Sequence, residues 1–211
     1  MRNSYLKPED VALSISLLDP SFRNLTTHLG PPPRRRRVPV SLRFATLTSA
    51  VTSQLLSTKA AATIHARVIT ACEGLITPTS VVTAGPETLR SVGLSWNKAL
   101  TITNLAERTL EGRLRFERHG RMSDADVASE LVDVRGVGPW TAQIYLMSTL
   151  ARPDIWPIGD LGVRHGWTLI HGDKELISPA RLLAEGENFP GVRSSVAWYC
   201  WQAVNIQRGE R

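Results

Sequence analysis

Two glycines and a proline lie together in the segment VRGVGPW, residues 134–140, between two apolar helical patterns. Gly136 and Gly138 can adopt backbone angles that a side chain forbids, so we expect a tight turn whose amides can approach a ligand closely. Pro139 suits the first position of a helix, where its missing N–H would have no partner. A helix that begins this way presents free amides and the positive end of its dipole, which favours an anion. The alternative is an ordinary turn between helices with a C-cap glycine.

A carboxylate and several aromatic rings could add chemistry to this anion site. Asp160 lies directly before the apolar pattern that begins at Leu161, where an aspartate caps a helix and stays ionised. An ionised carboxylate stabilises a developing positive charge and can orient or deprotonate water, as in sugar hydrolases. Trp140 and Trp201 offer ring faces that attract a cationic group by about 0.5–2 kcal/mol, although a single tryptophan is more often a core residue.

The elements that must position these residues are helices. Helix starts and stops are frequent along the chain and strand patterns are nearly absent, which predicts an all-α protein. Ser57, Ser95 and Ser123 are the expected N-caps of three of these helices. The expected helices cover residues 1–29 (as one or two short helices), 41–52, 57–74, 86–93, 95–112, 123–133, 139–151, 162–170, 179–187 and 191–205.

Composition limits the possible classes of protein. The 211 residues are enough for a full core, as one domain or two closely packed lobes, and no apolar run is long enough to cross a bilayer. Cys72 and Cys200 lack partners at metal-ligand spacing, which argues against a disulfide scaffold or an iron–sulfur cluster. The formal charge of +6 comes largely from arginine and permits a polyanionic partner. The arginine run at residues 34–37 is either a solvated face or a phosphate contact.

Longer segments around these residues resemble one known family. The string LVDVRGVGPWTA resembles a helix-hairpin-helix motif, which grips a DNA phosphate without reading bases. Downstream, DIWPIGDLGVRHG carries an aromatic-Pro-x-Gly-Asp segment, and this pairing resembles the helix-hairpin-helix DNA glycosylase superfamily. The segments SAVTSQLLSTKAAATIHARV and VRSSVAWYCW resemble its alkylbase, or 3-methyladenine, branch. The resemblance covers roughly residues 28–204.

The resemblance assigns roles to individual residues. It makes Asp160 the catalytic carboxylate, whereas the neighbouring Asp154 is less favoured because it precedes the proline. It places Leu55 as the wedge that fills the gap left by an extruded base, with core packing as the alternative reading. The implied base pocket consists of Trp140 and Trp201, with Trp156 and Tyr199 as second-line members. The implied DNA contacts are Gln54, Leu55, Ser57, Arg135, Gly136, Val137, Gly138, Thr141 and Arg164, although surface or salt-bridge roles remain open for the two arginines.

The hairpin also bears on the type of glycosylase. In the bifunctional glycosylase/lyases of this superfamily, a lysine at the position of Trp140 attacks the sugar and forms a Schiff base. No lysine lies between Lys98 and Lys174, so we expect a monofunctional enzyme that leaves an abasic site. The resemblance implies no organic cofactor. It implies at most a structural monovalent cation, held by the backbone carbonyls of Val132, Val134 and Val137.

These observations predict a two-lobed, all-α helix-hairpin-helix DNA glycosylase fold without a β-domain. One lobe covers residues 42–150 and ends in the hairpin and its helix, and the other combines residues 1–41 with 151–211. The expected reaction is hydrolysis of the N-glycosidic bond of alkylated purines, such as 3-methyladenine and 7-methylguanine, in damaged duplex DNA during base excision repair. We expect a cytoplasmic, nucleoid-associated monomer with no membrane partner.

Two other functions remain open at this point. Ile144 lies where some bacterial members have a pocket tyrosine, and Thr52-Ser53 replaces the more usual Val-Gly before Gln54, so the range of lesions is not determined. A glycosylase of the same fold could instead release a neutral base, such as hypoxanthine, uracil or a mismatched base. A non-catalytic protein that binds DNA and marks lesions is the second alternative, and it predicts that Asp160→Asn changes nothing except stability.

Overall fold

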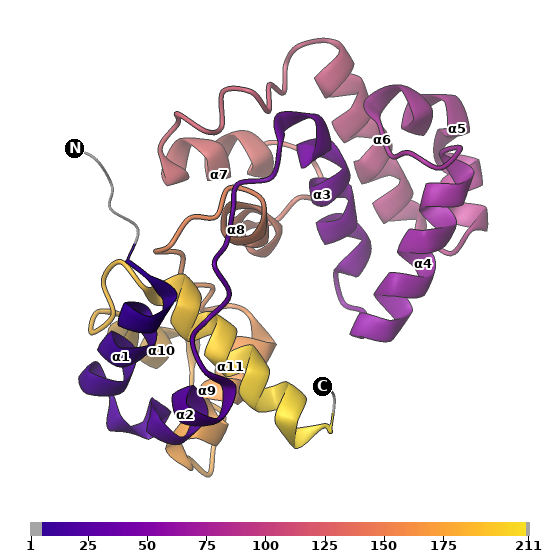
Figure 1. Cartoon of the computed structure of the whole chain (residues 1–211). Helices are drawn as coiled ribbons and strands as arrows, with labels where there is room; N and C mark the ends of the chain where they lie inside the picture. The colour runs from indigo at the N-terminus through magenta and orange to yellow at the C-terminus, as the bar shows by residue number, and fades with distance from the viewer. Residues whose placement is uncertain (1–5, 210–211) are drawn as a thin grey trace. The chain divides into compact units, whose positions relative to one another are not determined.

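The structure, a computed structural model, describes residues 6–209. Over this range the chain forms eleven α-helices, one 3-10 helix and no strand, which confirms the predicted all-α class (Figure 1). The chain divides into a middle unit, Arg36–Ala151, and a terminal unit, which combines the residues up to Arg35 with those from Arg152 onward. No helix in residues 6–209 combines the length and the apolar character that a membrane span requires.

Helix α3 is the central element of the middle unit. It packs against α4, α6 and α8, while α5 pairs with α6 and α7 pairs with α8 (Figure 1). Leu47 and Val51 of α3 are fully buried at helical spacing, and so are Ile102 and Leu105 of α6, so both helices contribute an apolar stripe to the same core. The six helices are α3 (Val40–Ser53), α4 (Thr58–Ala71), α5 (Pro78–Ser91), α6 (Trp96–Leu110), α7 (Asp124–Val132) and α8 (Pro139–Ser148).

The capping serines predicted from the sequence are confirmed. Ser57, Ser95 and Ser123 each accept a hydrogen bond from the backbone amide three residues later, at the starts of α4, α6 and α7. The prediction around Pro86 was incomplete, because α5 already begins at Pro78 behind a Thr77 capping box. Gly85 interrupts α5 with φ 72° and ψ 162°, so Pro86 restarts a helix instead of opening the first one.

The terminal unit is built from both ends of the chain. Its helices are α1 (Pro8–Leu18), the 3-10 helix η1 (Pro20–Phe22), α2 (Arg23–Leu29), α9 (Leu161–His171), α10 (Pro179–Gly186) and α11 (Arg193–Gln207). Helices α9 and α11 approach closely because Gly166 has no side chain: a Cβ there would lie 1.9 Å from the carbonyl oxygen of Cys200. Phe22 lies edge-on to Trp167, Phe189 and Tyr199, so the N-terminal helices are anchored in the aromatic core of α9 and α11.

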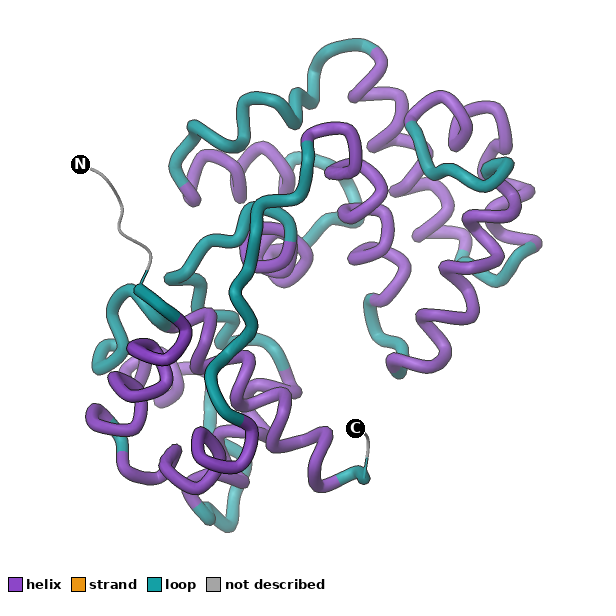
Figure 2. The backbone as a smooth tube through the Cα atoms, in the orientation of Figure 1, coloured by secondary structure: helices purple, strands orange, loops and turns teal. Residues whose placement is uncertain are grey.

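The segment from Gly30 to Pro39 contains the arginine run and forms the loop between α2 and α3 (Figure 2). Its prolines exclude a helix, and it falls between the expected helices 1–29 and 41–52. At its end, Arg37 donates to the carbonyl oxygen of Gly120 at 3.3 Å, and the amide of Val38 donates to Thr149 at 2.8 Å. The last residues of the loop are therefore bound to the middle unit by backbone groups far away in the sequence.

Candidate functional site

Asp160 occupies the N-cap of α9, as the sequence predicted. Its Oδ1 accepts a hydrogen bond from the backbone amide of Val163 at 2.8 Å, which satisfies one of the amides that a helix start leaves without a partner. The residue is only 7% exposed. A carboxylate in this position faces the free amides and the positive end of the dipole of α9.

Trp201 of α11 holds the same carboxylate from a second side. Its indole Nε1 donates to Oδ1 of Asp160 at 3.0 Å. Gly162 leaves room for this contact, because a Cβ at that position would lie 3.0 Å from Cδ1 of Trp201 and 3.1 Å from Oδ1 of Asp160. The amide of Val163 and the indole of Trp201 both donate to Oδ1 and so fix the orientation of the carboxylate. A carboxylate that stabilises a nearby positive charge must be held in a fixed orientation.

The four predicted pocket aromatics fall into two groups. Trp156 is 9% exposed, donates from Nε1 to the carbonyl oxygen of Leu182 at 2.7 Å and packs edge-on against Trp167. Tyr199 is fully buried and donates its hydroxyl to the carbonyl oxygen of Gly30 at 2.8 Å. Both side chains are enclosed in the core of the terminal unit, whereas Trp140 and Trp201 are half-buried. Of the four predicted pocket residues, only Trp140 of the middle unit and Trp201 of the terminal unit therefore present partly exposed rings.

Asp154, the less favoured catalytic carboxylate, and Arg164, an expected DNA contact, both bind other groups of the protein. Asp154 pairs with Arg193 at 3.0 Å, and the same arginine donates to the carbonyl oxygen of Gly186 at 2.8 Å. The guanidinium of Arg164 donates from Nε to the carbonyl oxygen of Ile177 at 2.7 Å. Asp154 therefore belongs to an ion pair that ties α11 to the segment before α9, while Asp160 has the geometry of an oriented carboxylate.

The hairpin between α7 and α8 needs its first glycine for two reasons. Gly136 has φ +91°, a region that side chains rarely adopt. A Cβ at this position would also lie 1.9 Å from Oγ1 of Thr101 on α6. That hydroxyl donates to the carbonyl oxygen of Arg135 at 3.1 Å, so α6 packs directly against the turn.

Gly138 differs from the expectation that both glycines serve the backbone conformation. Its φ of −92° and ψ of 174° are extended angles that any residue adopts, so the predicted conformational reason is wrong for this position. Nothing lies within 4 Å of the place where its Cβ would be. Gly138 is the N-cap of α8 and makes no side-chain cap, with Pro139 following at the first helical position. The missing side chain thus leaves open space beside the first amides of α8.

Gln54 connects the end of α3 to the hairpin. Its Nε2 donates to the carbonyl oxygen of Gly136 at 3.1 Å and to Oγ1 of Thr141 at 2.7 Å. Thr141 is only 1% exposed. The side chains of Gln54 and Thr141, both expected among the DNA contacts, therefore bind each other inside the protein and position the hairpin.

Leu55 follows Gln54 with an unusual combination of exposure and backbone conformation. The residue is 104% exposed, so the alternative reading of core packing is wrong. Its φ of 56° is left-handed, which is unfavourable for a residue with a side chain. A strained backbone that presents a fully exposed leucine indicates a functional role for this side chain. Ser57, Arg135 and Val132 are also exposed, whereas Val137 is buried.

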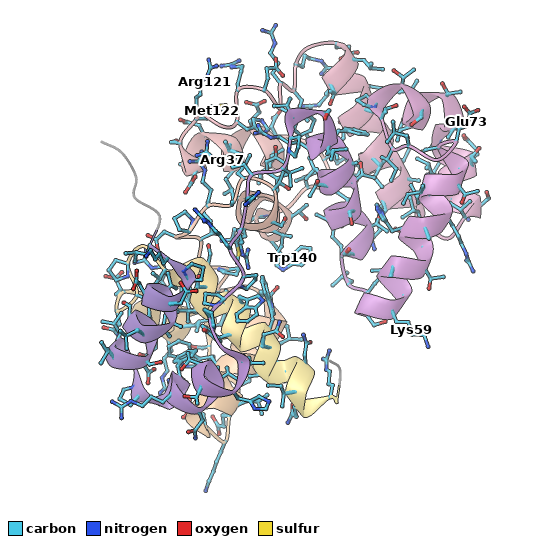
Figure 3. The ribbon with its side chains drawn as sticks, viewed as in Figure 1. Arg37, Lys59, Glu73, Arg121, Met122 and Trp140 are labelled. Carbon is cyan, nitrogen blue, oxygen red and sulfur yellow. The ribbon has the colours of Figure 1, made fainter. Side chains whose placement is uncertain are left out.

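Sequence reasoning missed the contribution of α6. Thr101 is 5% exposed and lies between apolar residues of the buried face, where a polar side chain is unusual. That placement was the only available signal, because its partner Arg135 is 34 residues away in the sequence. Trp140, labelled in Figure 3, lies on the first turn of α8 directly after the hairpin that Thr101 supports.

The hairpin offers backbone groups as candidate cation ligands. The expected ligands are the carbonyl oxygens of Val132, Val134 and Val137, a donor type that suits a monovalent cation. The Val134 carbonyl accepts the amide of Val137 at 2.9 Å and retains a second lone pair. No group of three or more His, Cys, Asp or Glu side chains in residues 6–209 could hold a metal ion. A monovalent cation on the carbonyl oxygens of Val132, Val134 and Val137 stays a prediction.

Known proteins are similar to this chain in sequence and in structure. DNA-3-methyladenine glycosylase 1 of Schizosaccharomyces pombe is 27% identical over 197 residues, which are 92% of this chain and 86% of that protein. The structure of the Schizosaccharomyces pombe 3-methyladenine DNA glycosylase Mag1 in complex with abasic DNA matches with a TM-score of 0.85 at 28% identity, covering 92% of this chain and 95% of that one. A DNA-3-methyladenine glycosidase from Bacillus halodurans matches with a TM-score of 0.73 at 26% identity, covering 93% and 91%.

A family model gives the assignment. The model of the HhH-GPD superfamily of base excision DNA repair proteins matches residues 48–190. This range includes Gln54 and Leu55, the hairpin with Gly136 and Gly138, and Asp160 at the start of α9. The chain belongs to the HhH-GPD superfamily of base excision DNA repair proteins.

Proposed function

We propose that this protein is a monofunctional DNA glycosylase that removes alkylated purines, such as 3-methyladenine and 7-methylguanine, from duplex DNA in base excision repair. The observation that carries the proposal is the carboxylate of Asp160, held at Oδ1 by the amide of Val163 and the indole of Trp201. The relatives named 3-methyladenine DNA glycosylases support the substrate class. We further propose that the enzyme acts as a monomer, since one chain supplies both the carboxylate and the hairpin.

The chemistry follows from the charge of the substrate. An enzyme must extrude a base from the duplex before it can reach the glycosidic bond, and Leu55 would fill the gap that remains. The ring faces of Trp140 and Trp201 would attract the positively charged alkylated base. As the glycosidic bond breaks, the base leaves with the bonding electrons and becomes neutral, and the sugar gains positive charge.

Asp160 would act on the sugar side of this bond. Its ionised carboxylate would stabilise the oxocarbenium character of the sugar and orient or deprotonate the water that adds to it. The products would be a free base and an abasic site. A cationic base departs without protonation by a general acid, so one carboxylate is sufficient.

The lysines support the absence of a lyase step. The residue at the hairpin position of the lyase nucleophile is Trp140, and no lysine lies between Lys98 and Lys174. Lys98 itself donates from Nζ to the carbonyl oxygens of Thr52 and Gln54 at 2.8 and 2.6 Å. An ammonium bound to two carbonyls is a poor nucleophile, because its lone pair carries a proton.

The hairpin would bind the DNA backbone. The open space at Gly138 and the uncapped amides of α8 suit a phosphate, which makes binding dependent on salt and independent of sequence. A monovalent cation on the carbonyls of Val132, Val134 and Val137 would add a positive charge at this contact. Replacing small monovalent ions by tetramethylammonium at constant ionic strength should then weaken DNA binding.

The decisive experiment measures release of 3-methyladenine and 7-methylguanine from methylated duplex DNA, with DNA binding measured in parallel. Asp160→Asn should bind DNA and release no base, because asparagine caps a helix as well as aspartate does but carries no charge. Asp154→Asn is the matched control and should retain activity. If wild type binds methylated DNA and releases neither base, the alkylpurine assignment is wrong, and a panel of neutral lesions then separates a different glycosylase from a non-catalytic binder.

A further inference from the structure

Lys98 of α6 reaches across to the end of α3. Its Nζ donates to the carbonyl oxygens of Thr52 and Gln54 at 2.8 and 2.6 Å. These carbonyls belong to the last turn of α3, where a helix leaves its acceptors without partners and where a positive charge is favourable. The side chain is half-buried, and burial lowers the pKa of its ammonium, so the charge is partly withdrawn from water to make this contact.

The residue after this contact is the strained wedge. Leu55 combines φ 56° with complete exposure, so its own side chain makes no contact that could hold this conformation. The turn contains few hydrogen bonds of its own: the amide of Leu56 donates to Ser53 at 3.2 Å and that of Gln54 to Val51 at 3.3 Å. The unfavourable conformation of Leu55 must therefore be maintained by groups outside the turn.

Gln54 links the turn to the hairpin. Lys98 binds the backbone carbonyl of Gln54, and the side-chain amide of Gln54 binds the carbonyl oxygen of Gly136. Three residues further along the same helix, Thr101 binds the carbonyl oxygen of Arg135. Residues three apart share one face of a helix, so α6 presents two side chains that fix the wedge turn and the hairpin relative to each other.

We propose that Lys98 is a positioning residue that fixes Leu55 in the register from which it enters the DNA duplex. It acts through the backbone of Gln54 and does not touch the DNA. This inference rests on the proposed function, because it assigns to Leu55 the role of wedge. A lysine that only stabilised α3, or that bound a phosphate, would not act through Leu55.

The test uses insertion of the wedge as its readout, which needs no bond cleavage. The probe is a duplex with a tetrahydrofuran abasic site opposite 2-aminopurine, whose fluorescence rises when it is unstacked. Wild type should raise the fluorescence, and Lys98→Met should lose most of the rise. Lys98→Arg should restore it, because arginine can donate to both carbonyls. Lys174→Met, which removes an equally charged but exposed side chain of the terminal unit, is the control and should behave as wild type.

A second measurement separates positioning from general stability. Single-turnover excision from methylated duplex DNA should fall about tenfold in Lys98→Met, because the side chain of Leu55 is then misplaced. In a Leu55→Ala background, adding Lys98→Met should cause no further loss, since the two residues act as one unit. If the two losses multiply, or if Lys98→Arg fails to restore the fluorescence, the inference is wrong.

The remaining outcomes are also informative. If Lys98→Met does not fold, Lys98→Gln is used instead. A folded Lys98→Gln that raises the fluorescence as wild type does contradicts the inference, and one that loses most of the rise supports it. If wild type inserts Leu55 but excises no alkylated base, the proposed function fails and the Lys98 inference is judged from the fluorescence alone. If wild type leaves the fluorescence unchanged, Leu55 is no wedge and the inference is wrong.

Discussion

The indole N–H of Trp201 donates to Oδ1 of Asp160 across 3.0 Å, which joins two residues 41 positions apart in the sequence. The same oxygen accepts the amide of Val163, so the carboxylate is oriented by one donor from α9 and one from α11. The contact also fixes the plane of the Trp201 ring. One hydrogen bond thus couples the candidate catalytic group to a candidate pocket wall.

Trp201→Phe removes this donor and retains an aromatic ring. Excision of alkylated purines should fall about tenfold, or ~1.4 kcal/mol, because the carboxylate loses one of its orienting hydrogen bonds. Trp198→Phe is the matched control on α11, since the indole of Trp198 packs against Tyr199. The measurement is the single-turnover excision rate of both variants. If Trp201→Phe excises as fast as Trp198→Phe, the hydrogen bond from Trp201 has no catalytic role.

The two hairpin glycines should respond differently to alanine. Gly136→Ala should destabilise the protein by about 2–4 kcal/mol, because the new Cβ meets Thr101 and φ is positive. Gly138→Ala should change stability by less than about 0.5 kcal/mol, because its angles are ordinary and its surroundings are open.

The same pair of variants tests the DNA contact. Gly138→Ala should weaken DNA binding about tenfold, because its methyl group occupies the space left for a phosphate beside the first amides of α8. Denaturant unfolding checks the predicted stabilities of the two variants, and titration with duplex DNA at fixed salt checks their DNA binding. A Gly138→Ala variant that binds DNA as wild type does would show that the hairpin backbone is not the phosphate contact.

Leu55→Asn should separate stability from function. Asparagine tolerates left-handed angles better than leucine, so the free energy of unfolding should rise by up to about 1 kcal/mol. Excision from duplex DNA should fall about tenfold, because the wedge is lost. Glu73, labelled in Figure 3, is an exposed residue with the same φ of 56°. Glu73→Asn should therefore give a similar gain in stability with unchanged activity.

His119 should make folding sensitive to mild acid. Its ring is fully buried, with Nδ1 2.9 Å from the hydroxyl of Tyr145 and Nε2 3.3 Å from Glu130. Burial lowers the pKa of His119 below its usual 6.5, although the hydrogen bond to Glu130 acts in the opposite direction. The unfolded chain then binds more protons than the folded one below about pH 6.5, so stability should fall as the pH drops through this value.

Denaturant unfolding at about pH 7.5 and pH 5 measures the effect of His119. His119→Gln should be less stable than wild type at the higher pH and should lose less stability on acidification. His65, whose pKa burial also lowers, contributes in the same direction, so His65→Gln is the comparison variant. An unchanged pH dependence in His119→Gln would assign the effect to other groups.

Much of the local structure was predictable because it depends on residues within one helical turn. The caps at Ser57, Ser95, Ser123 and Asp160 each involve a side chain and an amide three residues later. Such contacts can be read along the chain without knowing how helices pack. The error at α5 also has a local origin: Pro86 is typical of a helix start, but here it follows Gly85, which interrupts a helix that already began at Pro78.

The sequence by itself determined the all-α class, the hairpin, the family and the candidate carboxylate. Tertiary structure alone decided what holds these parts: Gln54 reaches Gly136 across 82 positions and Lys98 reaches Thr52 across 46. It also decided that Gly136 is needed for the approach of Thr101, whereas Gly138 leaves open space. Tyr199 is buried and Leu55 is fully exposed. The type of a residue indicates only how often such residues are buried on average, whereas the burial of a particular residue depends on which helices pack against it.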